Sequence, residues 1–90
     1  MTDPAERIEE LRVRIAANDR EIVSAVNERL RLVEELWQLK AELGSDRLDL
    51  ERERRLREQL AGGNGGPLSA EGLDALVTEL LALTKRELGS

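Results

Sequence analysis

The sequence predicts an all-α fold of three helices, of which the first is much longer than the other two. Apolar residues return at helical spacing along most of the chain. Two short segments, rich in glycine or polar residues, interrupt this spacing and divide the chain into three parts. The composition agrees with a helical bundle, because 37% of the 90 residues are charged and 1% are aromatic, so a core must consist of aliphatic side chains.

The first helix is expected to run from about Ala5 to Leu43, a stretch without proline or glycine, and to stop at Gly44. At 1.5 Å per residue this helix would be about 57 Å long, whereas a compact domain of this length is about 30 Å across. Two short helices do not supply enough cover for its apolar stripe. We therefore expect an intertwined homodimeric helical bundle in which the long helices of two copies pack together, in preference to a long coiled coil.

Two shorter helices are expected to follow. The second runs from Leu50 to about Leu60, with Asp49 as its N-cap. The glycine-rich run 62–67 is expected to be a turn, because neither a helix nor a strand tolerates so many glycines. Ser69 then caps a third helix of about Ala70 to Leu88. The glycine-rich turn and the short third helix favour a folded-back bundle.

The residue types exclude several kinds of chemistry. Without Cys or His, the chain lacks thiol nucleophiles, disulfides, Cys/His zinc sites and imidazole acid–base catalysis. The net charge is -5 and the 14 Lys and Arg are mixed with acids, so no nucleic-acid footprint is expected. No apolar run approaches the roughly 18 residues of a membrane span, and no signal-peptide pattern occurs. We expect a single helical domain, residues 1–90, that acts in the cytoplasm and binds neither nucleic acid nor a membrane.

Two basic residues of the first helix lie where apolar side chains are expected. Arg29 lies among Val26, Leu30 and Val33, and Lys40 follows 11 residues later, within about 20° of the same direction. Their Cα atoms would be about 16 Å apart, which leaves room for one small anionic molecule between the two side chains. Both positions are equally consistent with ordinary surface residues on a helix rich in Arg and Glu.

Three charged residues share one side at the start of the second helix. Asp49, Arg52 and Glu53 stand at i, i+3 and i+4, and the simplest interpretation is a capping aspartate followed by exposed ion pairs. Arg12 lies 17 residues before Arg29 and points about 100° away from it, so the two do not share a pocket on one helix. If Arg12 serves the pocket of Arg29, it comes from the other subunit.

At these positions the sequence resembles the all-helical chorismate mutases. The resemblance rests on Leu11-Arg12, Ile15, Asp19, Glu28-Arg29, Leu32-Val33, Lys40, Asp49 and Arg52-Glu53, at the spacing of the family and without gaps. The segment 64–68, Asn-Gly-Gly-Pro-Leu, is similar to that of the branch of the family that is often attached to the first enzyme of aromatic biosynthesis. The resemblance implies a homodimer, a small dianionic substrate, no cofactor and no metal. It also suggests another enzyme of aromatic biosynthesis as a partner.

The resemblance implies a role for each site residue. Arg29 and Arg12 of the other subunit would bind the two carboxylates of chorismate. Lys40 would reach the ether oxygen of the breaking bond, and Glu53 would accept a hydrogen bond from the ring hydroxyl. The residues that would support the ring end are Asp49 and Arg52. The implied reaction is the intramolecular rearrangement of chorismate to prephenate, which needs no nucleophile.

The third helix departs from the pattern of the family. The family places Ser or Thr there and, four residues later, a Gln that donates a second hydrogen bond to the ether oxygen. Thr84 fits the first position, but Leu88 stands at the second; a slip of one residue would bring Glu87 there, which donates only when protonated. In the first helix, Trp37-Gln38 replaces the common Gly-Lys. Trp37 either narrows the pocket or packs in the core.

These departures leave three interpretations. The first is a chorismate mutase of primary metabolism, weaker than usual or activated by a partner. The second is a relative specialised for an analogue, such as a 4-amino-4-deoxychorismate mutase or an isochorismate pyruvate-lyase, because Asp49 and Glu53 would suit a 4-ammonium group as well as a hydroxyl. The third is a non-catalytic helical dimer or regulatory module that keeps the fold without turnover.

Overall fold

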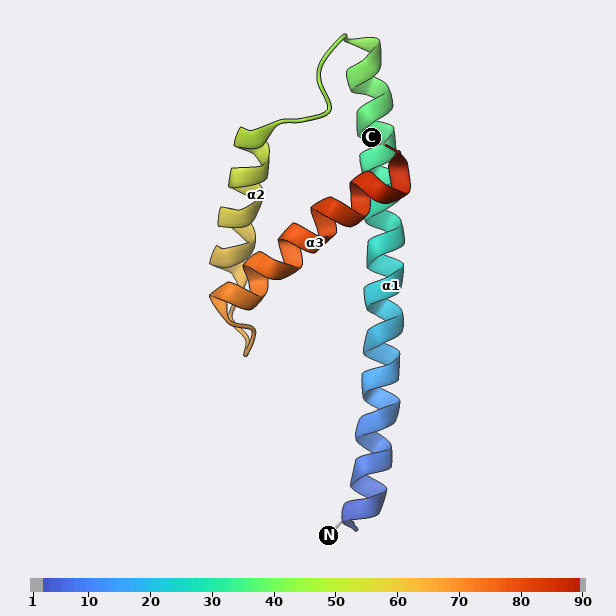
Figure 1. Cartoon of the computed structure of the whole chain (residues 1–90). Helices are drawn as coiled ribbons and strands as arrows, with labels where there is room; N and C mark the ends of the chain where they lie inside the picture. Colours follow the sequence, from blue (N-terminus) through green and yellow to red (C-terminus); the bar gives the residue numbers. More distant parts are fainter. Residues whose placement is uncertain (1–2, 90) are drawn as a thin grey trace. The chain divides into compact units, whose positions relative to one another are not determined.

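A computed structural model describes residues 3–89 and consists of three α-helices: α1 (Pro4–Glu42), α2 (Leu50–Gly63) and α3 (Ala70–Leu88) (Figure 1). Within residues 3–89 there is no strand, which confirms the all-α fold with one long first helix. None of these helices combines the length and apolarity that a membrane crossing requires, over the residues described.

In the first unit of the chain, Met1–Leu32, residues 4–32 belong to α1. Its apolar side chains are exposed, with Ile8, Leu11, Ile15 and Ile22 between 39% and 59% accessible. These four residues lie on one stripe because their spacing follows the helical repeat. A single chain therefore leaves a continuous apolar stripe of this unit in water, which is unfavourable by about 25 cal/mol for each Å².

The second unit, Val33–Ser90, starts with the last turns of α1. Here α1 ends in a Schellman motif, in which Gly44 N donates to Ala41 O at 3.1 Å and Ser45 N donates to Lys40 O at 2.8 Å. Gly44 has a φ of 70°, in the left-handed region that favours glycine. The prediction that Gly44 stops the first helix is confirmed.

The start of α2 agrees with the sequence and its end does not. Asp49 Oδ1 accepts a hydrogen bond from Arg52 N at 3.1 Å, so Asp49 is the N-cap, as predicted. The helix continues to Gly63, past the expected end at Leu60. The expectation that Gly62 and Gly63 belong to the turn is therefore wrong. Glycine costs a helix about 1 kcal/mol, and α2 accommodates this cost in its last turn.

Asn64 organises the turn that follows α2. Its backbone N–H donates to Ala61 O at 3.3 Å, and its side-chain Nδ2 donates to Leu68 O at 2.9 Å. Its Oδ1 accepts from Gly66 N at 3.4 Å. Asn and Asp side chains commonly stabilise turns in this way by bonding to nearby backbone. The stop of α2 thus comes from Asn64, one residue after the glycines that were expected to end it.

The third helix has the bounds that the sequence predicts. Ser69 Oγ accepts a hydrogen bond from Gly72 N at 3.0 Å, which makes Ser69 the N-cap. At the other end, Gly89 has a φ of 72° and donates its N–H to Lys85 O at 3.0 Å. Both ends of α3 are therefore fixed by local hydrogen bonds.

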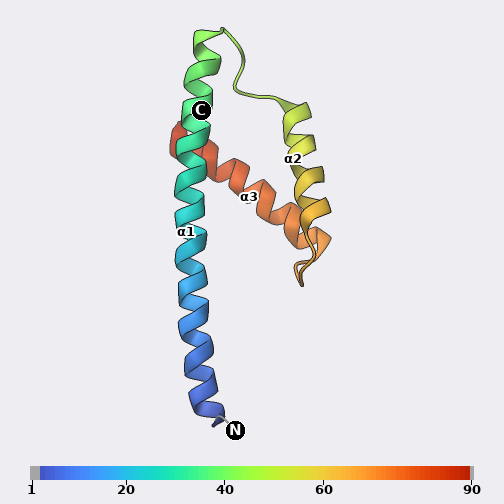
Figure 2. The ribbon, with the colours of Figure 1, turned by 180° about the vertical axis from the view of Figure 1, so that it is seen from behind.

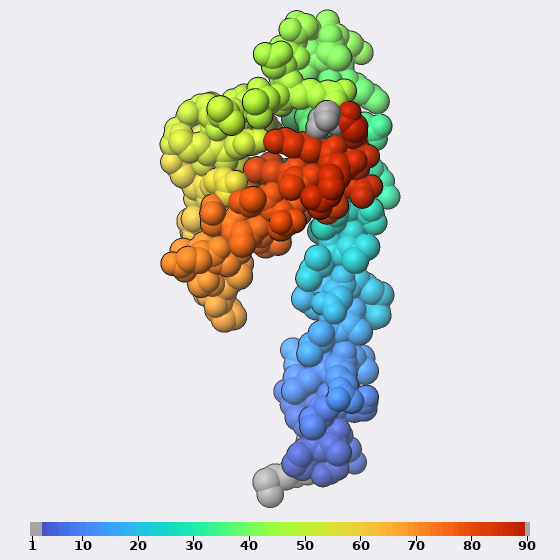
Figure 3. Space-filling view, viewed as in Figure 1, coloured from blue at the N-terminus to red at the C-terminus, as the bar shows by residue number. Residues whose placement is uncertain are grey.

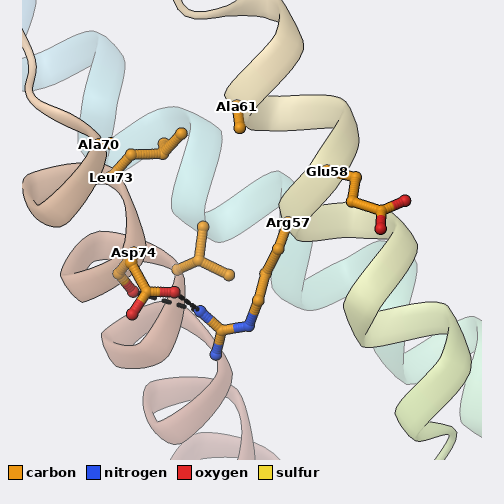
Figure 4. A pocket seen from close by; sticks show the side chains of 7 residues that line it. Arg57, Glu58, Ala61, Ala70, Leu73 and Asp74 are labelled. Carbon is orange, nitrogen blue, oxygen red and sulfur yellow. Dashed lines mark hydrogen bonds and ion pairs between the residues drawn. The ribbon is translucent and has the colours of Figure 1, made fainter.

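Helices α2 and α3 pack against each other on the two sides of the Asn64 turn (Figures 2 and 3). Val77 is 1% exposed. Arg57 joins the two helices, because its Nη1 donates to Asp74 Oδ1 at 2.6 Å (Figure 4) and its Nη2 donates to Thr78 Oγ1 at 3.2 Å. Beside this link lies an apolar hollow of about 230 Å³. Its lining residues are Arg57, Glu58, Ala61, Ala70, Leu73, Asp74 and Val77.

Candidate functional site

Helix α1 carries three of the basic residues predicted for the site. Arg29 and Lys40 are half-buried, whereas Arg12 is exposed. The guanidinium of Arg12 lies 4.0 Å from Glu9 Oε2, and the two side chains are 72% and 65% accessible. An ion pair this long and this exposed holds the side chain only weakly. Arg12 therefore remains available to an anionic ligand, while Arg29 and Lys40 occupy less hydrated positions.

Lys40 lies in the last turn of α1, where a cation is favoured by the helix dipole. Its backbone carbonyl takes part in the Schellman motif at Gly44. Its ammonium group forms no ion pair with any side chain between residues 3 and 89. A half-buried cation without an internal counter-charge is a good ligand for an anion or for an oxygen that gains negative charge.

The first turn of α2 brings Asp49, Arg52 and Glu53 to one side of the helix, as their spacing predicts. Asp49 is occupied as the N-cap, but Arg52 and Glu53 form no side-chain ion pair within the described part of the chain. Glu53 is half-buried and Arg52 is exposed. The simple interpretation is confirmed for the cap, and exposed ion pairs do follow it, but Glu51, Arg54 and Arg55 form them and not Arg52 or Glu53.

Other charged side chains of α2 do form ion pairs with one another. Arg54 pairs with both Glu51 and Glu58, and Arg55 Nε lies 3.7 Å from Glu51 Oε1. The hydrogen bond from Arg54 to Glu51 is the main reason that the pKa of Arg54 is raised, with a further contribution from Glu58. These groups neutralise one another on a solvated face. The contrast leaves Arg52 and Glu53 as the charges of this helix that are free to meet a ligand.

Near the end of α3, Thr84 is 5% exposed and its hydroxyl donates to Leu80 O at 2.7 Å. Leu88, four residues later, is half-buried, whereas Glu87 is exposed. The face of α3 that carries Thr84 therefore continues through Leu88 and not through Glu87. This supports the alignment in which an apolar side chain replaces the second donor of the family pattern.

One contact beside these residues was not anticipated from the sequence. The guanidinium of Arg47 lies 4.7 Å from the centroid of the Trp37 ring, within the range of a cation–π interaction. Trp37 precedes Lys40 by less than one helical turn, and Arg47 lies in the segment before Asp49. A pair of this kind leaves no periodic signal, because one partner is in a helix and the other is in a loop.

Comparison with known proteins identifies the family. Residues 11–87 match the family model of chorismate mutase type II. Among solved structures, the chain is similar to a chorismate mutase from Thermus thermophilus, with 35% sequence identity and a TM-score of 0.83, over 87% of this chain and 98% of that chain. The search of curated proteins found no match. The chain therefore belongs to the chorismate mutase type II family and is an isomerase.

Proposed function

We propose that the protein catalyses the intramolecular rearrangement of chorismate to prephenate, in a homodimer whose cationic pockets are shared between subunits. The observation that carries this proposal is the family match, because residues 11–87 include every proposed site residue except Leu88. The unpaired charges of Lys40, Arg52 and Glu53 support it, since they are available to a ligand. The exposed stripe of the first unit supports the dimer.

Two arginines hold the substrate in this proposal. Arg29 of one subunit and Arg12 of the other each bind one carboxylate of chorismate. A guanidinium binds a carboxylate through two parallel hydrogen bonds, which fix its direction as well as its distance. With both carboxylates fixed, the enolpyruvyl arm is held over the ring in a reactive conformation. The two arginines therefore act mainly by positioning the substrate.

Lys40 acts on the bond that breaks. During the rearrangement the ether C–O bond opens while a C–C bond forms between the enolpyruvyl arm and the ring, and no atom leaves the substrate. Negative charge grows on the ether oxygen, and a fixed cation there is worth about 3 kcal/mol or more in the transition state. Leu88 supplies no hydrogen bond to this oxygen. Lys40 therefore carries most of its stabilisation, and Thr84 of α3 is a further substrate-binding residue in this proposal.

The acidic end of the site recognises the ring substituent. Glu53 accepts a hydrogen bond from the ring hydroxyl, and Asp49 and Arg52 support this end. A specific observation also favours a second substrate: Glu53 is half-buried and has no cationic partner among residues 3–89. A carboxylate in that state gains more from a ligand cation than from a neutral hydroxyl. The second candidate is therefore the mutase reaction of 4-amino-4-deoxychorismate.

An absorbance assay tests both candidates. Purified protein is mixed with chorismate, and then with the 4-amino analogue, between about pH 5 and 8, and the loss of substrate absorbance is followed. We expect chorismate to be consumed. Consumption of the analogue alone would support the second candidate, and consumption of neither would contradict both substrates. A rate that rises when the first enzyme of aromatic biosynthesis is added would establish that enzyme as a partner.

The variant Lys40→Ala tests the proposed mechanism in the same assay. We expect kcat to fall by about 100-fold or more with KM changed only slightly, because the lost interaction is made in the transition state. Arg55→Ala is the matched control, since Arg55 is a basic residue on the solvated face of α2, and its kinetics should equal those of the wild type. A rise in KM of Lys40→Ala that equals the fall in kcat would contradict the role at the ether oxygen.

A further inference from the structure

The segment between α1 and α2 is held at both of its ends. Gly44 and Ser45 close α1 with one backbone hydrogen bond each, and Asp49 opens α2 by capping Arg52 N. Between these points, the side chain of Arg47 lies over the ring of Trp37 at 4.7 Å. Arg47 forms no ion pair within the part of the chain that is described. Its contact with Trp37 is thus its anchor to α1.

This contact spans the two groups of site residues in the second unit. Trp37 is on α1 less than one turn before Lys40, and Arg47 is two residues before Asp49. A shift of the segment at Arg47 would move the start of α2, and with it the first turn that carries Glu53. The distance between the cation at one end of the site and the carboxylate at the other therefore depends on this segment.

We propose that Trp37 and Arg47 form a tie that positions the first turn of α2 relative to Lys40, and that both are positioning residues for substrate binding. The inference rests on the proposed function, since it assigns the tie to the chorismate site. Neither side chain needs to touch the substrate. The tie keeps the segment in the arrangement that the substrate binds, so less binding energy is used to order it.

The tie has a kinetic signature that differs from that of a catalytic residue. When the segment adopts the binding-competent arrangement only part of the time, the apparent affinity for the substrate equals the intrinsic affinity multiplied by the populated fraction. Chemistry in the bound complex is unchanged, because the bound substrate restores the arrangement. Loss of the tie should therefore raise KM by about two- to fivefold, the size of an exposed cation–π contact, and leave kcat within about twofold.

A double-mutant cycle tests the tie. Arg47→Ala and Trp37→Leu should each raise KM, and the double variant should be no worse than either single variant, because the second change has no contact left to remove. The conservative variants Arg47→Lys and Trp37→Phe keep a cation and a ring, and they should restore most of the affinity. Arg55→Ala is the control for loss of a positive charge. Additive effects in the double variant, or equal damage from the conservative variants, would overturn the proposal.

Fluorescence gives a second readout that does not depend on turnover. The chain has one Trp and no Tyr, so its emission comes from the Trp37 ring alone. Arg47→Ala should shift this emission to longer wavelength as water replaces the guanidinium, whereas Arg55→Ala should leave it unchanged. An unchanged emission in Arg47→Ala would overturn the tie. If Arg47→Ala shows the shift but the wild type does not consume chorismate, the proposed function fails and the assignment of the tie to that site fails with it, while the contact itself stands.

Discussion

The two units of the chain differ in whether their side chains find partners within a single chain. In Met1–Leu32, residues 4–32 form one continuous length of helix whose apolar stripe is exposed. In Val33–Ser90 the helix ends are capped, Val77 is buried, and Arg57 joins α2 to α3. The second unit thus contains its own stabilising interactions. The first unit contains a helix and a surface that is stable only when something covers it.

Because of this difference, we expect mutations in the two units to affect different properties of the protein. A helix without tertiary partners is marginal in water, and most helical stability comes from packing of an apolar face. Changes on the stripe of the first unit should therefore act through assembly of two chains. Changes in the second unit should act within one chain, on the stability of a helix or on the chemistry of the site.

The largest effect should come from placing a charge on the stripe. Ile15→Glu should prevent the proposed homodimer from forming and reduce turnover of chorismate by about 100-fold or more, because burying an unpaired carboxylate is very costly. Light scattering after size exclusion measures the mass. Val13→Glu is the matched control, since Val13 is 66% exposed and lies on the opposite side of α1. A dimer that survives Ile15→Glu unchanged would contradict this use of the stripe.

Mixing two inactive variants should give the next largest effect. Arg12→Ala and Arg29→Ala should each be nearly inactive, because each lacks one carboxylate ligand in both pockets. After subunits exchange at equal amounts, about half of the dimers are mixed and one of their two sites is intact. Activity should therefore recover to about a quarter of the wild type. If mixing restores nothing, Arg12 does not serve the pocket of the other subunit.

A change in the second unit should raise activity instead. Leu88→Gln supplies the hydrogen-bond donor that the family places four residues after Thr84. We expect kcat to rise by about tenfold, less than the full worth of such a donor, because the surrounding side chains are not arranged to hold it. Steady-state kinetics measure this, with Glu87→Gln as the control on the exposed side of α3. A gain with Glu87→Gln and none with Leu88→Gln would favour the alternative alignment.

The smallest effect should come from the cap of α3. Ser69→Ala should lower the free energy of unfolding by about 1 kcal/mol, since it removes the acceptor for Gly72 N. Urea denaturation followed by circular dichroism measures the loss. Ser69→Asn keeps a capping oxygen and should retain most of the stability. The mass in solution should stay that of the wild type, unlike the result expected for Ile15→Glu.

Local signals in the sequence predicted much of this fold. Gly44, Asp49 and Ser69 mark helix ends through hydrogen bonds to residues that are close in sequence, so their roles follow from residue type and position. The glycines after Leu60 predict an end of α2 that is too early, because α2 continues through Gly62 and Gly63. The effective stop is Asn64, whose side chain bonds forward to Leu68 O, and composition alone does not reveal that bond.

Contacts between distant parts of the chain could not be predicted in the same way. Arg57 and Asp74 are 17 residues apart, and many other acids were equally available to this arginine. The contact of Trp37 with Arg47 depends on the path of the loop after α1. For the candidate site, spacing predicted that Arg29 and Lys40 share one helix face and that Asp49 and Glu53 share another, whereas the site itself is what the resemblance to the chorismate mutases implies. Its assembly from two chains remains a prediction, because it depends on a second copy.

The glycine-rich turn has a consequence for the unfolded protein. Gly62, Gly63, Gly65 and Gly66 have no heavy atom within 4 Å of an added Cβ, and none of them has a positive φ. Neither the last turn of α2, which contains Gly62 and Gly63, nor the turn that follows it therefore requires glycine at these positions. Each glycine instead widens the range of conformations open to the denatured chain, which an alanine would narrow by about 0.4 to 1 kcal/mol. Replacement of the two glycines on either side of Asn64 is therefore a way to stabilise this protein without changing its folded structure.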